Sequence, residues 1–127
     1  HLLMHGSSSV PQDWLAIINE HGGAKGETYG VPVEEIVEGI KHGVPNVNID
    51  TDLRMASNDA IRKYLVDNPK EFDPRKYFIA ATKAMKGICK DRYEAFGTAG
   101  NASKIRALSL EAMTDRYAKG ELDPKVN

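Results

Sequence analysis

The sequence lacks the features that mark several classes of protein. It has a single cysteine, Cys89, in 127 residues, so no disulfide can form within the chain, as is usual in a reducing cytoplasm. It has no run of the roughly 18 apolar residues that a membrane-spanning helix needs. Its formal net charge is -1, and it contains no long basic block. The composition therefore argues against membrane and nucleic-acid partners and favours a cytoplasmic protein.

The start of the chain lacks two further features. It has neither an initiator methionine nor the charged segment and long apolar stretch of a signal peptide. An apolar run begins immediately after His1, where a domain normally has polar residues before its first buried strand. We therefore expect that another part of the same domain precedes this chain. At 41% hydrophobic residues, the chain itself has enough apolar content for a core.

Apolar periodicity predicts alternating strands and helices in the first half of the chain. Two strands joined through a helix should be parallel, with a right-handed crossover. A parallel sheet is buried on both faces and needs more than two strands, so this pattern is a second sign of a larger α/β domain. The expected elements are a buried strand over 1–5, a helix over 11–19, a glycine-rich loop over 22–30, an amphipathic helix ending at Gly43, and a strand over 46–50.

Only helices are predicted after the second strand. An apolar stripe over 53–65 indicates the first of them. Asp73 followed by Pro74 is a typical start for the next helix, which should extend to about Phe96. We expect its apolar face to be Phe78, Ala81, Met85 and Ile88, with Cys89 in the core, and its solvated face to be Lys83, Lys86, Lys90 and Arg92. A last helix should begin after Ser109 and bury Leu110, Met113 and Tyr117.

Small polar residues follow both predicted strands. The first strand leads into His5, Gly6, Ser7 and Ser8, and the second ends within "NIDTD", residues 48–52. Parallel α/β folds have their sites at the carboxyl ends of strands. Glycine lets a backbone approach a ligand closely, and successive N–H groups with serine hydroxyls can surround a phosphate. These segments therefore predict one anion site, with His5 beside it as a metal ligand or an acid–base group.

A purely structural interpretation of the same residues stays open. A Gly-Ser-Ser-Ser segment is common in turns, and a histidine at a strand end often has only a structural hydrogen bond. Thr51 or Asp52 would also suit a cap of the helix that follows. A metal needs three or four ligands, and the other histidines are not spaced to join His5, namely His1, His21 and His42.

Five segments, in order along nearly the whole chain, resemble one known family: "HGSSSVPQDW", "GETYGVPVEEI", "HGVPNVNIDTDLR", "EFDPRKY" and "RYEAFGTAG". Together they resemble the C-terminal part of class II fructose-bisphosphate aldolases, in the branch of bacterial glycolysis and the Calvin cycle. The resemblance implies a zinc-dependent (β/α)8 TIM barrel. In this family the metal acts as a Lewis acid while fructose 1,6-bisphosphate is cleaved reversibly to dihydroxyacetone phosphate and glyceraldehyde 3-phosphate.

The resemblance also implies how the chain is organised. It would hold strands 7 and 8 of the barrel and the helices that follow them. Residues 1–66 would form the last two β/α units, and residues 67–127 a C-terminal helical extension. The intact protein would be a homo-oligomer, either a dimer or a tetramer.

Roles at the strand ends follow from the same resemblance. His5 resembles the last of three zinc-ligating histidines. Gly6, Ser7 and Ser8 resemble the loop that holds the phosphate of dihydroxyacetone phosphate, with Ser7 in place of a glycine found in many members. Asn48 resembles a catalytic asparagine that binds the substrate near the reacting carbons.

Further positions match the rest of the substrate site. Ile49, Asp50 and Thr51 lie where the family completes the phosphate site, partly through backbone groups, and a monovalent cation is implied nearby. Arg75 resembles an arginine that reaches the second phosphate in a neighbouring subunit, since a guanidinium matches phosphate oxygens. The alternative for Arg75 is a solvated residue in the first turn of a helix.

Several parts of the family's site have no match here. The other two zinc histidines, the catalytic aspartate and the acid–base glutamate are absent, so we expect the 127-residue chain to be inactive by itself. Two alternative functions remain. A tagatose-bisphosphate aldolase would share the fold, the metal and the phosphate loops, and a non-catalytic phosphate-binding or interaction fragment would use only part of them.

Overall fold

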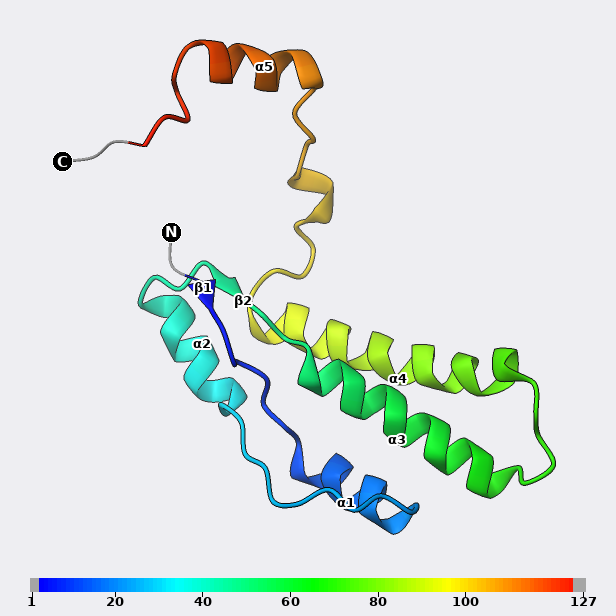
Figure 1. The fold of residues 1–127 in the computed structure, drawn as a ribbon. Helices are drawn as coiled ribbons and strands as arrows, with labels where there is room; N and C mark the ends of the chain where they lie inside the picture. The colour runs from blue at the N-terminus through cyan, green and yellow to red at the C-terminus, as the bar shows by residue number, and fades with distance from the viewer. Residues whose placement is uncertain (1–2, 125–127) are drawn as a thin grey trace.

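A computed structural model of the chain describes residues 3–124, which are mostly helical (Figure 1). None of the helices in this part of the chain is long and apolar enough to cross a membrane. In chain order the elements are β1 (Leu3–Met4), α1 (Gln12–Glu20), α2 (Val33–Lys41), β2 (Asn46–Val47), α3 (Thr51–Asp67), α4 (Pro74–Ala95), the short 3-10 turn η1 (Ala102–Lys104) and α5 (Leu110–Ala118).

The two strands are parallel, as predicted. Leu3 pairs with Asn46 and Met4 with Val47, and α1 and α2 lie in the connection between them. The N–H of Asn48 extends the pairing by donating to the carbonyl oxygen of Met4 at 3.1 Å. Both strands are shorter than predicted, and the predicted residues 1 and 2 lie outside the described part. No third strand occurs within residues 3–124, and Leu3 is exposed, so the expectation of a buried first strand is wrong for this residue.

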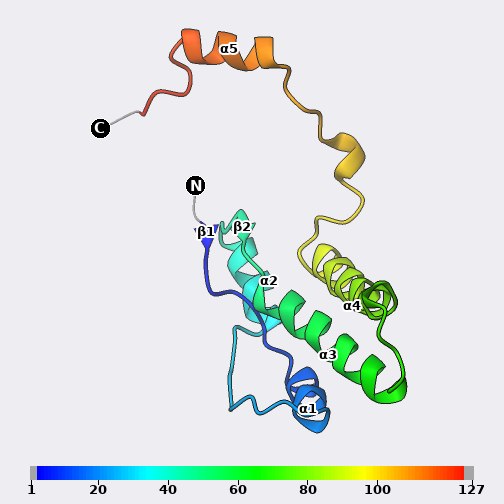
Figure 2. The same cartoon turned by 45° about the vertical axis from the view of Figure 1, so that its right-hand side comes forward.

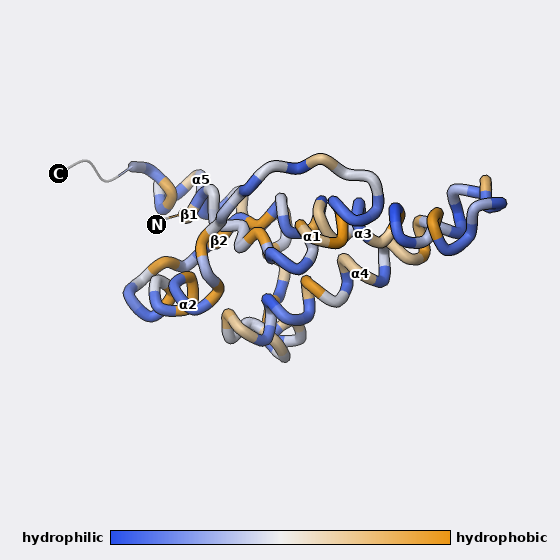
Figure 3. The backbone as a smooth tube through the Cα atoms, turned by 90° about the horizontal axis from the view of Figure 1, so that it is seen from below, coloured by the Kyte–Doolittle hydropathy of each residue, from blue (hydrophilic) through white to orange (hydrophobic). Residues whose placement is uncertain are grey.

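The core lies between the segment that follows β1 and the helices α1 and α3. Its buried members are Val10, Leu15, Ile18 and Met55, with Trp14 packed against them. Hydrophobic stretches of α1 and α3 lie close together there (Figure 3). Helix α4 runs back along α3 as the second member of a helical hairpin (Figures 1 and 2). This packing holds the carboxyl end of α4 near β2.

Helix starts were predictable, whereas the burial of some helix faces was not. Asp73 caps α4 by accepting from the N–H of Arg75, and Ser109 caps α5 by accepting from the N–H of Ala112. However, Leu110 is 84% exposed and Phe78 is 54% exposed, contrary to expectation, and Tyr117 is also exposed. Helix α5 projects away from the other helices (Figures 1 and 2). Periodicity shows which side chains share a face, but it does not show what covers that face.

Candidate functional site

The candidate site begins with residues 5–10, which we call the strand-end loop because they follow β1. Gly6 has a φ of +66°, in the left-handed region that L side chains rarely adopt. An added Cβ at Gly6 would meet nothing within 4 Å. The backbone conformation, rather than a lack of space, therefore favours glycine at this position.

Ser7 connects the ends of the two strands. Its side chain is fully buried, and Oγ lies 3.1 Å from the carbonyl oxygen of Met4 and 2.6 Å from that of Asn48. A hydroxyl has one proton to donate, and the shorter distance favours the oxygen of Asn48. The side chain of Ser7 is thus directed at the protein backbone. Only the backbone of this residue is left to face a ligand.

Ser8 contacts the beginning of α3. The N–H groups of Asp50 and Thr51 lie 3.3 and 3.1 Å from Ser8 Oγ and donate to it. The first N–H groups of a helix have no partner within the helix, and the positive end of the helix dipole lies there. The hydroxyl of Ser8, from another segment, therefore takes the place of a side-chain cap. Loop and helix start together form a region that suits an anion.

The capping that the sequence suggested for Thr51 or Asp52 does not occur. Asp50 precedes the helix and its side chain makes no capping hydrogen bond. Its carboxylate instead accepts from Arg54 Nε at 2.9 Å on the exposed surface. The carboxylate of Asp52 turns away from the helix start and back toward the strand-end loop.

His5 and Asn48 meet at the ends of the paired strands. Asn48 Nδ2 lies 3.3 Å from His5 Nδ1, and both residues are exposed. Within residues 3–124 there is no group of three or more His, Cys, Asp and Glu side chains that could hold a metal. Zinc takes three or four protein ligands. At the strand ends the described residues thus supply one imidazole, that of His5, and they do not form a zinc site by themselves.

Asp52 is the centre of a buried polar cluster that sequence analysis missed. This residue is 0% exposed, yet its carboxylate has four donors. The N–H and Oγ of Ser9 lie 3.1 and 2.8 Å from Oδ2, the N–H of Val10 lies 2.9 Å from Oδ1, and Arg92 Nη2 lies 3.1 Å from Oδ2. We call these four residues the Asp52 cluster. It joins the strand-end loop, α3 and α4.

The expectation that Arg92 belongs to a solvated face is therefore wrong. Its side chain is only 14% exposed, and Nη2 also donates to Ser9 Oγ at 2.7 Å. Burial by itself raises the pKa of Asp52, but the hydrogen bonds from Val10, Ser9 and Arg92 outweigh it and hold that pKa below its usual range. Asp52 is therefore a carboxylate at neutral pH, paired with the guanidinium.

Two further backbone features concern the strand-end loop: the φ angle of Val10, and the close contact of residues 30 and 31 with Ser8. Val10 has a φ of +50°, which is rare for a β-branched residue, and its N–H is one of those bound by Asp52. The N–H of Val31 donates to the carbonyl oxygen of Ser8 at 3.1 Å. Beside it, a Cβ on Gly30 would lie 2.0 Å from that same oxygen. Only glycine lets the second segment approach the loop so closely.

The structure does not bring Arg75 to these residues. Arg75 lies at the beginning of α4, is 87% exposed, and pairs with Asp73 at 2.6 Å. Arg92 lies near the other end of the same helix. The two arginines are seventeen positions apart in the sequence, which corresponds to about 25 Å along an α-helix. Arg75 is therefore remote from the strand ends of its own chain.

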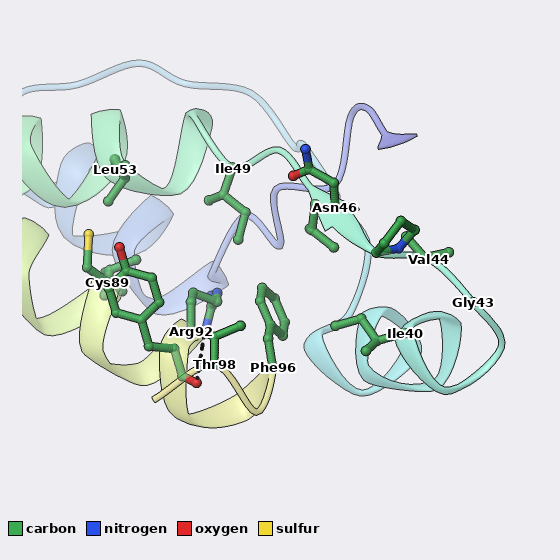
Figure 4. A pocket seen from close by; sticks show the side chains of 14 residues that line it. Ile40, Gly43, Val44, Asn46, Ile49, Leu53, Cys89, Arg92, Phe96 and Thr98 are labelled. Carbon is green, nitrogen blue, oxygen red and sulfur yellow. Dashed lines mark hydrogen bonds between the residues drawn. The ribbon is translucent and has the colours of Figure 1, made fainter. Parts of the chain in front are cut away.

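Ile49 lines a separate apolar pocket of about 640 Å3 on this part of the molecule. The pocket lies between β2, the end of α2, the start of α3 and the last turns of α4 (Figure 4). Cys89 is half-buried in its wall, and Arg92 forms part of its boundary with the Asp52 cluster. The side chain of Ile49 thus belongs to an apolar wall, leaving its backbone for any contact at the strand ends.

Comparisons with known proteins cover the whole chain. The family model described as "Fructose-bisphosphate aldolase class-II" matches residues 1–101. Over 127 residues the chain is 75% identical to a fructose-bisphosphate aldolase of Pseudomonas aeruginosa, covering 100% of the chain and 36% of that protein. It is 61% identical over 123 residues to one from Nostoc sp., covering 97% of the chain and 34% of that protein. The chain thus spans about a third of the length of these relatives, and it belongs to the class II fructose-bisphosphate aldolase family.

Proposed function

We propose that this chain is the C-terminal part of an enzyme that reversibly cleaves fructose 1,6-bisphosphate to dihydroxyacetone phosphate and glyceraldehyde 3-phosphate. One observation carries the proposal: the family match covers residues 5–9 and 46–52, the segments that lie side by side at the strand ends. The relatives named fructose-bisphosphate aldolase are 57–75% identical over alignments that cover 98–100% of the chain. The proposed protein is cytoplasmic and has no nucleic-acid or membrane partner.

In this proposal β1 and β2 are strands 7 and 8 of an eight-stranded barrel. Residues 1–66 are the last two β/α units, and residues 67–127 are a C-terminal helical extension. The parallel pairing and the helical crossover support this placement, since adjacent strands of such a barrel have these relations. The candidate site also lies at the carboxyl ends of both strands, where barrel enzymes have their active sites.

The phosphate of dihydroxyacetone phosphate is proposed to bind between the strand-end loop and the start of α3. Gly6 and Ser7 would contribute backbone N–H groups, and Ser8 its hydroxyl. Ile49, Asp50 and Thr51 would complete the site through backbone groups, assisted by the positive end of the helix dipole. To bind the phosphate directly, the N–H groups of Asp50 and Thr51 would have to give up their contact with Ser8 Oγ. A monovalent cation would lie beside the phosphate. The support for this assignment is the contact of Ser8 Oγ with the N–H groups of Asp50 and Thr51.

Asn48 and His5 would serve the reacting end of the substrate. The Asn48 amide would hold the oxygens near the bond that breaks. His5 would supply one ligand to a zinc ion whose other ligands come from outside these residues, and the ion would supply Lewis-acid chemistry when bound. To ligate through Nδ1, His5 would have to give up its contact with the Asn48 amide. The guanidinium of Arg75 would reach the second phosphate in a neighbouring subunit of a homodimer or tetramer, which its exposed position permits.

The test is a cleavage assay on the full-length protein with and without a chelator. We expect cleavage of fructose 1,6-bisphosphate that is lost with the chelator and restored by zinc, while the isolated 127-residue chain is inactive. A protein that cleaves tagatose 1,6-bisphosphate more efficiently would favour the alternative aldolase. If the protein binds dihydroxyacetone phosphate equally well with and without zinc and cleaves neither sugar bisphosphate, a non-catalytic binding module is favoured instead.

A further inference from the structure

The Asp52 cluster connects the candidate phosphate site to a helix far away in the sequence. Arg92 lies 83 residues after Ser9 and 40 residues after Asp52, yet its Nη2 contacts both side chains, at 2.7 and 3.1 Å. No other residue of α4 makes a side-chain hydrogen bond to the strand-end loop within the described part of the chain. The helix thus reaches the candidate site through one guanidinium.

The cluster holds the residue next to Ser8. Ser9 has both its N–H and its hydroxyl bound to Asp52, and its hydroxyl oxygen accepts from Arg92. On the other side of Ser8, the hydroxyl of Ser7 lies between the carbonyl oxygens of Met4 and Asn48. Ser8 is the serine of this loop whose hydroxyl faces the start of α3. The direction of the Ser8 hydroxyl therefore depends on the hydrogen bonds that fix Ser7 and Ser9 on either side of it.

We propose that Arg92 is a positioning residue for the phosphate site, acting through Asp52 and Ser9. It touches no substrate in this proposal, which rests on the proposed function. The guanidinium neutralises the buried carboxylate and orients the Ser9 hydroxyl, and this holds Ser8 and the neighbouring loop N–H groups toward the anion. Both contacts come from Nη2. Arg suits this task better than Lys, because the two N–H bonds of Nη2 lie in the guanidinium plane and point in fixed directions, whereas a Lys ammonium rotates freely.

The test compares conservative variants in the full-length protein. Arg92→Lys keeps the positive charge beside Asp52 but loses the planar Nη2 group, whose two N–H bonds have fixed directions. Asp52→Asn, a second variant, keeps the shape of the side chain but replaces one acceptor oxygen by an NH2 group, which cannot accept from the loop N–H that it faces, either that of Ser9 or that of Val10. Lys86→Ala is the matched control, because Lys86 is an exposed cation of the same helix. All variants are assayed well below their unfolding midpoints.

We expect both cluster variants to raise KM for fructose 1,6-bisphosphate by about tenfold, the order of magnitude for losing a hydrogen bond to a charged group. The phosphate is remote from the reacting carbons, so kcat should change much less than KM. Hydrogen exchange should become faster at the N–H groups of Ser9 and Val10. The Lys86→Ala variant should match the wild type in all three measurements. A fall in thermal midpoint with unchanged KM and unchanged exchange at these two amides would reduce the cluster to a structural role and overturn the inference.

A titration with inorganic phosphate separates this inference from the proposed function. If the wild type cleaves no sugar bisphosphate but binds phosphate, and Arg92→Lys binds it more weakly, the proposed function is wrong and the positioning role is supported. If the two proteins bind phosphate equally, the positioning role is overturned even when the wild type is an active aldolase.

Discussion

The two ends of α4 present the same residue type in opposite circumstances. At the beginning of the helix, Arg75 is 87% exposed and pairs with Asp73, two residues away in the sequence. Near the end of the helix, Arg92 is 14% exposed and pairs with Asp52, from a different helix. A local pair is held by the helix start itself, whereas the distant pair exists only when three segments fold together. The comparison teaches that burial separates a surface pair from one on which the fold depends, and that the buried pair joins residues far apart in the sequence.

The largest expected effect comes from breaking the buried pair. Arg92→Ala leaves Asp52 as an uncompensated buried carboxylate, and removing one partner of a buried ion pair typically costs about 3–5 kcal/mol. Arg75→Ala removes an exposed partner, so the unfolding free energy of that variant should stay close to that of the wild type. Urea unfolding of the full-length variants measures both. Equal losses for the two arginines would show that burial does not separate the two ends of the helix.

The second effect tests the close approach beside the strand-end loop. Gly30→Ala would place a Cβ 2.0 Å from the carbonyl oxygen of Ser8, so one of the two segments must move. Overpacking of this kind costs about 1–3 kcal/mol. Gly26→Ala is the matched control from the same loop, because a Cβ there meets nothing within 4 Å. We expect a lower unfolding midpoint for Gly30→Ala only. If both variants unfold like the wild type, the two segments are not in close contact.

Much of this arrangement could be predicted from the sequence, and the exceptions have physical causes. The parallel strands and the start of α4 at Asp73 follow from local periodicity and capping, and both are confirmed. The burial of Arg92 could also have been predicted, since this residue continues the apolar spacing of Ala81, Met85 and Ile88 by four residues. Its interpretation as solvated failed because the charge was given more weight than the spacing.

Other features had no local signal. Asp52 shares a helix face with Met55 and Ala56, but nothing near it in the sequence identifies Ser9 and Val10 as its partners. The close approach at Gly30 depends on a segment 22 residues earlier. The exposed Leu110 of α5 shows the reverse case, where an amphipathic pattern exists and no described element covers it. Long-range contacts therefore decide what periodicity leaves open.

A third prediction concerns acid. The folded-state pKa of Asp52 is lowered, so its contribution to stability is fully present above its unfolded value of about 3.9 and is lost as the pH falls through the folded value. The unfolding free energy of the wild type should therefore drop more steeply below about pH 4 than that of Asp52→Asn. Arg75 also lowers the pKa of Asp73, but this exposed guanidinium is open to screening by salt. The cap hydrogen bond that Asp73 accepts from the Arg75 N–H does not depend on salt. Asp73→Asn should therefore reduce the acid dependence less at high ionic strength than at low ionic strength. Equal slopes for wild type and Asp52→Asn would contradict the lowered pKa.

The smallest effect on stability is expected for Arg75→Ala. At this end of α4 we expect the substitution to affect substrate binding rather than folding. If this guanidinium reaches the second phosphate in a neighbouring subunit, Arg75→Ala should raise KM for fructose 1,6-bisphosphate by about tenfold or more, because a charge-assisted contact to a phosphate is lost. Unlike Arg92→Lys, it should leave hydrogen exchange at Ser9 and Val10 unchanged, since Arg75 contacts neither residue. Fructose 1-phosphate lacks the second phosphate, so its cleavage by Arg75→Ala should match that by the wild type. A loss that is equal for the two substrates would show that Arg75 does not bind that phosphate, and the solvated interpretation of its sequence position would then hold.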